Sequence, residues 1–101
     1  MSDASQSQDE KVVKLSRPVI DQNGKQHGSL TLREPSGAAY EKIGDAYHML
    51  MIDGKQSGIE LNRARLLSYV AEVTQIHRPL LVTMPLRDIR AVTDEMFAFL
   101  G

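Results

Sequence analysis

The side chains that most often carry chemistry are few in this sequence, and they are not grouped at the spacings that chemistry requires. His27, His48 and His77 lie far apart, whereas a helical metal site usually places two histidines four residues apart. The chain contains no cysteine, so it offers neither a thiolate ligand nor a cysteine nucleophile. We therefore predict no catalytic residue, no metal site and no cofactor.

Two short segments combine glycine with lysine, which raises the question of a phosphate-binding loop. Residues 24–28 read Gly-Lys-Gln-His-Gly, and residues 54–58 read Gly-Lys-Gln-Ser-Gly. Neither segment has the G-x-x-x-x-G-K-[ST] spacing that cradles phosphates, and no serine lies in the G-x-S-x-G turn of a hydrolase. We interpret both segments as turns and predict that the protein is not an enzyme.

Length and composition fit one small globular domain. The chain has 101 residues, of which 42% are hydrophobic and 25% charged, which is ordinary for a globular protein. Residues 1–10 are almost entirely polar and too poor in apolar side chains to be ordered by burial. We predict a flexible tail over residues 1–10 and a single domain over residues 11–101.

The charge balance and the lack of long apolar runs restrict the partners. The chain has 12 basic and 13 acidic residues, and its formal charge of -1 argues against a surface built for nucleic acid. No apolar run approaches the ~20 residues of a membrane span, and the N-terminus does not have the pattern of a signal peptide. We expect a cytoplasmic protein that binds another protein, without nucleic-acid or membrane contacts.

The first element predicted from the pattern of apolar residues is a β-hairpin. In residues 13–19 and 29–33, apolar side chains recur on one face of an extended segment. Between these segments, Asn23-Gly24 has the residue types of a two-residue turn, in which both residues adopt positive φ. Since a hairpin alone is marginally stable in water, the rest of the chain must cover its apolar face.

That cover is predicted to be helical. Ser36 is a suitable N-cap for a first helix, and Asp53-Gly54 is read as the end of that helix. Ser57 and Glu60 match a capping box and predict the start of a second helix, which Pro79 would stop. The stripe assigned to the first helix consists of Tyr40, Ile43, Tyr47, Leu50 and Met51, and that of the second of Ile59, Leu66, Leu67, Val70, Val73 and Ile76.

A last helix is predicted from Thr83 and Pro85 nearly to the C-terminus, after a short apolar link at residues 80–82. Its stripe consists of Leu86, Ile89, Val92, Met96 and Leu100. The predicted fold class is therefore α+β, with an N-terminal β-hairpin followed by a small bundle of about three helices.

Apolar side chains outside or beside these stripes are the candidates for partner contact. The predicted contact residues are Leu81, Met84, Phe97 and Phe99. Methionine suits such a surface because its flexible thioether adapts to varied partners. The sequence does not indicate the oligomeric state, and a homo-oligomer is left open.

The order of these features resembles a known family. Leu15 and Pro18 in the first strand, a turn at Gly24 and the segment Leu30-Thr31-Leu32-Arg33-Glu34-Pro35 precede helices that close with Phe99-Leu100. This arrangement is similar to the tail assembly chaperones of Mu-type contractile-tailed phages, over approximately residues 12 to 100. The start of the first helix departs from that family, because residues 36–39 read Ser-Gly-Ala-Ala where an acidic segment is expected.

The resemblance implies a function without catalysis or cofactor. Chaperones of this family bind the long, hydrophobic tape-measure protein and keep it soluble while tail-tube subunits polymerise around it. The resemblance therefore implies the tape-measure protein as partner, with the tail tube protein as a further one. It also implies action in the host bacterial cytoplasm, for a phage or prophage, and absence from the mature virion.

Two other functions are left open by the residues. A small nucleic-acid-binding regulator or antitoxin would present basic side chains to phosphates, the candidates being Arg17, Lys25, Arg33, Arg63 and Arg65. The charge balance and the lack of a recognition-helix pattern argue against it. The second alternative is an accessory domain of an enzyme whose active site lies on another chain.

Overall fold

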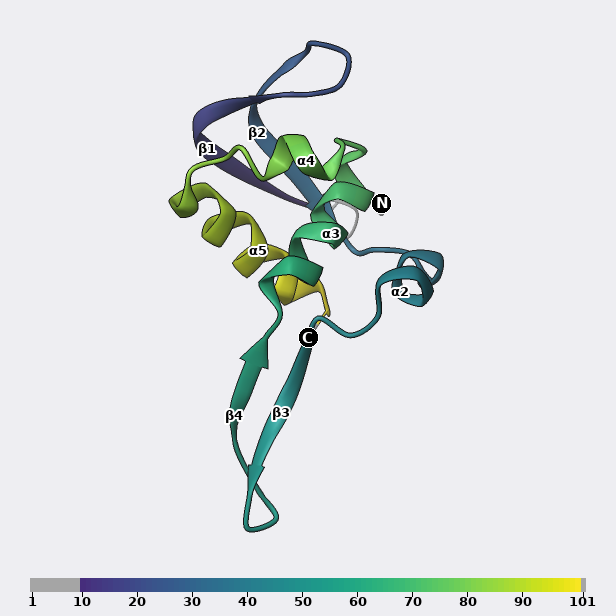
Figure 1. The fold of residues 1–101 in the computed structure, drawn as a ribbon, viewed down its shortest axis with the longest axis vertical. Helices are drawn as coiled ribbons and strands as arrows, with labels where there is room; N and C mark the ends of the chain where they lie inside the picture. The colour runs from purple at the N-terminus through teal and green to yellow at the C-terminus, as the bar shows by residue number, and fades with distance from the viewer. Residues whose placement is uncertain (1–9, 101) are drawn as a thin grey trace, which may run out of the picture.

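The computed structural model describes residues 10–100, and their fold is α+β, as predicted (Figure 1). The predicted tail at residues 1–10 lies outside this range apart from Glu10, with which the first strand begins. Within the described range the elements are β1 (Glu10–Ile20), β2 (Gln26–Arg33), α2 (Gly37–Ile43), β3 (Tyr47–Ile52), β4 (Lys55–Leu61), α3 (Arg63–Thr74), α4 (Arg78–Leu81) and α5 (Leu86–Leu100).

The predicted N-terminal hairpin is confirmed, and its inner face forms one side of the core. β1 and β2 pair antiparallel, and the alternation of apolar residues turns the same face of both strands inward. Helices α3 and α5 pack on this face and on each other. The buried side chains of the hairpin are Val13, Leu15, Val19, Leu30 and Leu32.

The turn of this hairpin is longer than the predicted two-residue turn. Ile20 pairs with Gln26, so five residues connect the strands, and only Gly24 has positive φ, at 82°. The Asp21 carboxylate holds this loop by accepting the backbone N–H groups of Asn23 at 2.8 Å and Lys25 at 2.9 Å. The loop therefore depends on an Asp side chain that organises the backbone, which an Asn-Gly dipeptide alone does not indicate.

The first predicted helix is wrong beyond its second turn. Ser36 is the N-cap of α2, as predicted, and accepts the Ala39 N–H at 3.2 Å, but the helix ends at Ile43 because Gly44 adopts a φ of 88°. The residues that follow form β3 and β4. Asp53-Gly54, read as a helix end, is the two-residue turn between these strands, and both residues have positive φ, at 53° and 76°.

The predicted capping box is also wrong. Ser57 lies in β4, where its hydroxyl donates to the Leu50 carbonyl oxygen at 3.2 Å, and α3 begins later, with Asn62 as N-cap. Helix α3 ends at Thr74, because Gln75 adopts the left-handed conformation, and not at Pro79. Pro79 instead occupies the first turn of the short helix α4, where its missing N–H is not needed.

The last predicted helix is confirmed as α5, and the predicted apolar link before it is largely the short helix α4. Val92 and Met96 of α5 are fully buried. Leu86 was assigned to the same stripe, but it is 68% exposed, whereas Asp88 in the same turn is 4% exposed and faces β1. The predicted bundle of about three helices thus consists, in residues 10–100, of four helices and a second pair of strands.

Candidate functional site

Two of the three histidines have side chains paired with carboxylates of the same chain. The His27 imidazole lies 2.8 Å from the Asp21 carboxylate, and the His48 imidazole lies 2.8 Å from that of Glu60. The hydrogen bond from His27 is the largest of the effects that lower the pKa of Asp21, to about 2, and the Lys25 backbone N–H adds to it. Among residues 10–100, no three metal-binding side chains converge on one point.

Asp88 is a buried carboxylate, and the structure gives it an anchoring role. It receives the Ser16 backbone N–H at 3.0 and 3.1 Å and the Ser16 hydroxyl at 3.0 Å. Ser16 lies where the pairing register of β1 shifts, so Asp88 satisfies a strand N–H at an irregularity of the sheet. Desolvation alone raises the pKa of Asp88, but the hydrogen bonds from Ser16 and Arg17 and the charge of Arg87 outweigh it and lower the pKa.

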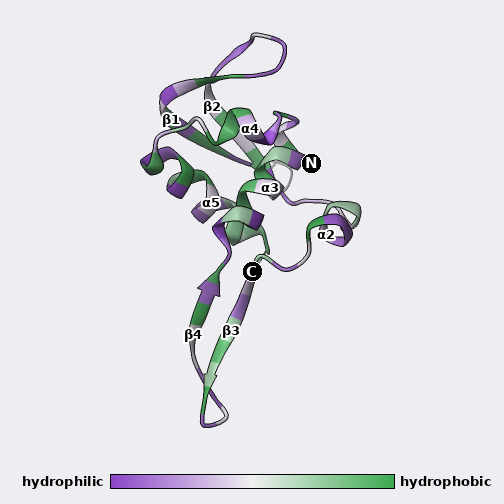
Figure 2. Ribbon diagram, viewed as in Figure 1, coloured by the Kyte–Doolittle hydropathy of each residue, from purple (hydrophilic) through white to green (hydrophobic). Residues whose placement is uncertain are grey.

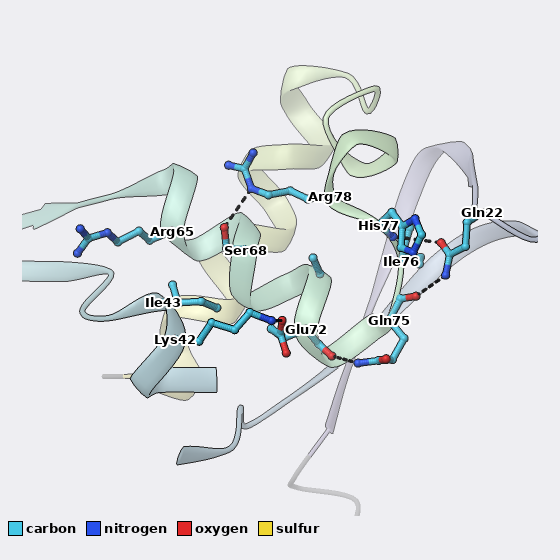
Figure 3. A pocket seen from close by; sticks show the side chains of 11 residues that line it. Gln22, Lys42, Ile43, Arg65, Ser68, Glu72, Gln75, Ile76, His77 and Arg78 are labelled. Carbon is cyan, nitrogen blue, oxygen red and sulfur yellow. Dashed lines mark hydrogen bonds and ion pairs between the residues drawn. The ribbon is translucent and has the colours of Figure 1, made fainter. Parts of the chain in front are cut away.

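The outer side of α3 borders a polar pocket of about 720 Å³ (Figure 3). Its Lys42 ammonium lies 2.6 Å from the Glu72 carboxylate, and Arg78 Nε donates to the Ser68 hydroxyl at 3.0 Å. Gln22 bridges the hairpin loop to this region through its side-chain amide, which meets the Gln75 carbonyl oxygen at 2.8 Å. The charged side chains of the pocket are thus engaged by the protein itself, which fits a structural role.

Two of the five basic residues proposed for nucleic-acid binding are engaged within the protein. Arg63 donates to the Asp94 carboxylate at 2.6 Å and to the Thr93 hydroxyl at 2.7 Å. Arg65 donates to the Asp45 carbonyl oxygen at 2.9 Å. Since these guanidinium groups are used to hold elements together, the structure does not favour a phosphate-binding surface.

The surface that does gather apolar side chains is the pair of strands β3 and β4, called here the β3–β4 ribbon (residues 47–61). Figure 1 shows this ribbon extending away from the helices and the first hairpin, and Figure 2 shows hydrophobic residues along β3. A folded protein normally buries such side chains or uses them for contact. The exposed fractions are 53% for Met49, 42% for Leu50, 57% for Met51, 63% for Ile52 and 43% for Ile59.

One face of the β3–β4 ribbon is almost entirely apolar. Side chains alternate along a strand, so Tyr47, Met49 and Met51 project from one face of β3. Leu61 and Ile59 of β4 pair with Tyr47 and Met49 and therefore share this face, and Gln56, which pairs with Met51, is its polar member. We call the five apolar side chains the apolar face of the ribbon. The opposite face carries the His48–Glu60 ion pair and is mixed in character.

The base of the ribbon is fixed to the helices. The rings of Tyr47 and Phe97 meet edge to face with their centroids 5.2 Å apart, so the apolar face continues onto α5. The buried Tyr69 hydroxyl of α3 donates to the Gly44 carbonyl oxygen at 2.6 Å. Burial and then the nearby Asp45 carboxylate raise the pKa of Tyr69, so this donor keeps its proton. The ribbon therefore projects from a defined base.

The four predicted contact residues have different surroundings. Leu81 and Met84 are 0% and 5% exposed and belong to the core, so the premise that they lie outside it is wrong. Phe97 and Phe99 are half-buried on α5 and pack against the core, and Phe97 also meets the ribbon. None of the four predicted contacts is on the ribbon. Three of its exposed residues, Leu50, Met51 and Ile59, were assigned to helix stripes.

A signal for the ribbon was present in the sequence. An Asp-Gly dipeptide flanked by apolar residues is among the strongest short-range indications of a hairpin. Residues 49–52 read Met-Leu-Met-Ile before Asp53-Gly54, and a helical spacing of apolar residues was given precedence over this turn.

The sequence model of one protein family matches nearly the whole chain. That family is described as phage tail assembly chaperone proteins, E, or 41 or 14, and the match covers residues 12–101. Comparisons with curated proteins and with solved structures gave no significant match.

Proposed function

Because the chain belongs to the phage tail assembly chaperone family, we propose that it binds the tape-measure protein and keeps it soluble while the tail tube assembles. The observation that supports this proposal is the exposed apolar β3–β4 ribbon. Aggregation of a long apolar client begins at apolar surfaces that are exposed to water, and a chaperone acts by covering these surfaces. No step of this function needs a catalytic residue or a cofactor.

The composition of the ribbon suits a client with many binding segments. Met49 and Met51 have flexible thioether side chains, which adjust to different apolar surfaces better than branched side chains do. Phe97 and Phe99 extend the proposed surface at the base of the ribbon, whereas Leu81 and Met84 are buried and are not included in it. The surface therefore combines an adaptable arm with a more rigid aromatic base.

The expected affinity of one such contact is modest. Covering one half-exposed methionine or isoleucine recovers on the order of 1 kcal/mol, so the exposed side chains of the apolar face, Met49, Met51 and Ile59, together supply roughly 3 kcal/mol before the entropy of association is subtracted. Several copies along one client would then act together through multivalency, and each could be displaced by the polymerising tube. In this proposal the chaperone works in the host cytoplasm, has the tail tube protein as a further partner, and leaves before the virion is complete.

The proposal is tested by co-expressing the chain with the tape-measure protein of the same phage or prophage. We expect the client to become soluble and to co-elute with the wild-type chain at both low and high salt, because apolar contacts resist salt. A client that stays insoluble beside wild-type chain would show that the proposed function is wrong.

The role of the ribbon is tested with the double variant Met49→Ser, Met51→Ser. Val12→Ser is the matched control, because Val12 is 60% exposed but lies on β1. We expect the double variant to lose most of the soluble client and the control to retain it. Equal amounts of soluble client with both variants would place the contact elsewhere on the chain.

A further inference from the structure

The outer edge of β3 lacks the features by which strands avoid pairing with other chains. Natural edge strands are usually blocked by lysine, proline, a bulge or an inward charge. β1 has several of these, with Lys11, Lys14 and Pro18 in its sequence and a register shift after Lys14. β3, which reads Tyr-His-Met-Leu-Met-Ile, contains no lysine, arginine, aspartate, glutamate or proline. Its pairing with β4 shifts register between Leu50 and Met51, but the extra residue, Ser57, lies on β4 and not on β3. The same chain therefore protects one edge strand and leaves another open.

The ribbon also lacks cover from the rest of the described chain. β3 and β4 form a sheet of two strands that extends beyond the helices (Figure 1), and the molecule measures 51 Å along its longest axis. Its radius of gyration is 14.8 Å, compared with about 13 Å for a compact domain of 100 residues. Two isolated strands are marginally stable in water, and a sheet with an apolar face gains independent stability from three or more strands.

We propose that β3 of one copy pairs antiparallel with β3 of a second copy, so that two ribbons form one four-stranded sheet about a two-fold axis. This arrangement leaves the tape-measure protein out of the contact, so it is independent of the proposed function. An antiparallel pair formed by two identical strands has its axis at one residue near the middle of the strand, which faces its own copy and is here Met49 or Leu50.

Charge and shape favour a second copy as the occupant of this edge. Apart from Tyr47, the one titratable side chain of β3 is His48, which lies 2.8 Å from Glu60 of its own chain. Pairing of β3 with a second β3 therefore brings no like charges together. β3 runs from the base of the ribbon towards its tip, so antiparallel pairing places the two helical bodies at opposite ends of the joint sheet (Figure 1). The bodies then do not collide, as they would in a parallel arrangement.

The size of the contact predicts a reversible dimer. Pairing of two six-residue strands buries on the order of 1,000 Å², which is at the lower end of specific interfaces. The pairing uses the strand edge and leaves both faces of the sheet accessible. The apolar faces of two ribbons then lie side by side, and the dimer presents about twice the apolar area of one copy.

The position of the contact is tested by single-cysteine variants, because the natural chain has no cysteine. Residues facing each other across an antiparallel pair have Cβ atoms about 5 Å apart, close enough for cross-linking by mild oxidation. We expect high yields of covalent dimer for Met49→Cys or Leu50→Cys, and yields that fall towards both ends of β3. Val12→Cys, an equally exposed position on β1, is the control. A yield at Val12→Cys equal to that in β3, or a maximum at Ile59→Cys on β4, would overturn the proposal.

The pairing itself is tested by charge reversal at the axis, in the absence of any client. By sedimentation velocity from about 1 to about 100 µM, the wild-type chain should shift from monomer to dimer. Leu50→Lys and Leu50→Glu should each remain monomeric because like charges meet at the axis, and an equal mixture of the two should dimerise again. Recovery in the mixture separates loss of pairing from loss of folding. A wild-type chain that stays monomeric, or a Leu50→Lys variant that dimerises as the wild type does, would show that β3 does not pair with itself.

Discussion

Replacing Asp88 by asparagine should destabilise the fold, because this side chain joins α5 to β1. Asp88 is 4% exposed and accepts the backbone N–H and the hydroxyl of Ser16. Asparagine has nearly the same shape, but it is uncharged and can turn an N–H donor towards the Ser16 N–H. The change therefore removes charge-assisted hydrogen bonds with little change in packing.

The expected loss is about 2 kcal/mol in the free energy of unfolding, since a hydrogen bond to a charged group contributes about 1.5–3 kcal/mol and the remaining amide oxygen retains part of it. With a urea m-value of about 1.5 kcal/mol/M, this loss lowers the unfolding midpoint by somewhat more than about 1 M. Asp94→Asn on the same helix is the control, because its salt bridge to Arg63 is exposed and should contribute less than about 1 kcal/mol.

The pH dependence gives an independent check on the same interaction. The pKa of Asp88 is lowered in the folded state, so its contribution to stability is fully present above the ordinary value of 3.8 and is lost as the pH falls through the lowered pKa. Urea titrations from neutral to acidic pH should therefore show the difference between wild type and Asp88→Asn shrinking in that acidic window. A difference below about 0.5 kcal/mol at neutral pH would refute the anchoring role.

Three further measurements test other parts of the structure. In His27→Ala, the pKa of Asp21 should rise from about 2 towards 3.8 in an NMR titration, and an unchanged value would remove His27 as the main cause. Gly54→Val should reduce stability by about 1–2 kcal/mol in urea, because φ is 76° there, whereas an effect near zero would contradict the turn. Leu81→Ala should reduce stability by about 2–5 kcal/mol, because Leu81 is buried. Leu86→Ala should reduce it by less than about 0.5 kcal/mol, because Leu86 is exposed, and similar losses for the two variants would contradict the assigned burial.

The sequence predicted the parts of the fold whose signals are local and unopposed. Alternation in β1 and β2, the N-cap Ser36 and the stripe of α5 apart from Leu86 were each read correctly, because the period of apolar residues and the cap agree there. Asn23-Gly24 was assigned to a two-residue turn and Asp53-Gly54 to a helix end, and both assignments were wrong. In the first, the Asp21 carboxylate accepts two backbone N–H groups and holds a longer loop.

The middle of the chain was misread because two patterns compete in it. Tyr40, Ile43 and Tyr47 have helical spacing, but Gly44 adopts positive φ and ends the helix before the third of them. Tyr47 then starts a strand, and its ring packs on Phe97, which is distant in the sequence. Such a long-range contact cannot be inferred from the spacing of neighbouring residues.

The candidate site was misplaced for a related reason. An apolar residue outside a predicted stripe was taken to be exposed, but Leu81 and Met84 lie between helices and strands that the sequence brings together only on folding. Conversely, Leu50 and Met51 fit a helical stripe and were assigned to the core, although they are 42% and 57% exposed. Exposure depends on which elements pack together, and one chain's periodicity does not contain that information.

The contrast between the two hairpins carries the main functional argument. Both have apolar faces, but α3 and α5 cover the face of the first hairpin, and Asp88 satisfies the irregular part of its edge strand. The β3–β4 ribbon has neither the covering helices nor charges along β3, although its base is held by Tyr69 and Phe97. An exposed apolar strand is an aggregation hazard that stability alone does not explain. Its presence in a chaperone family is understandable if the hazard is also the function, with the strand edge reserved for a second copy and the apolar face for the client.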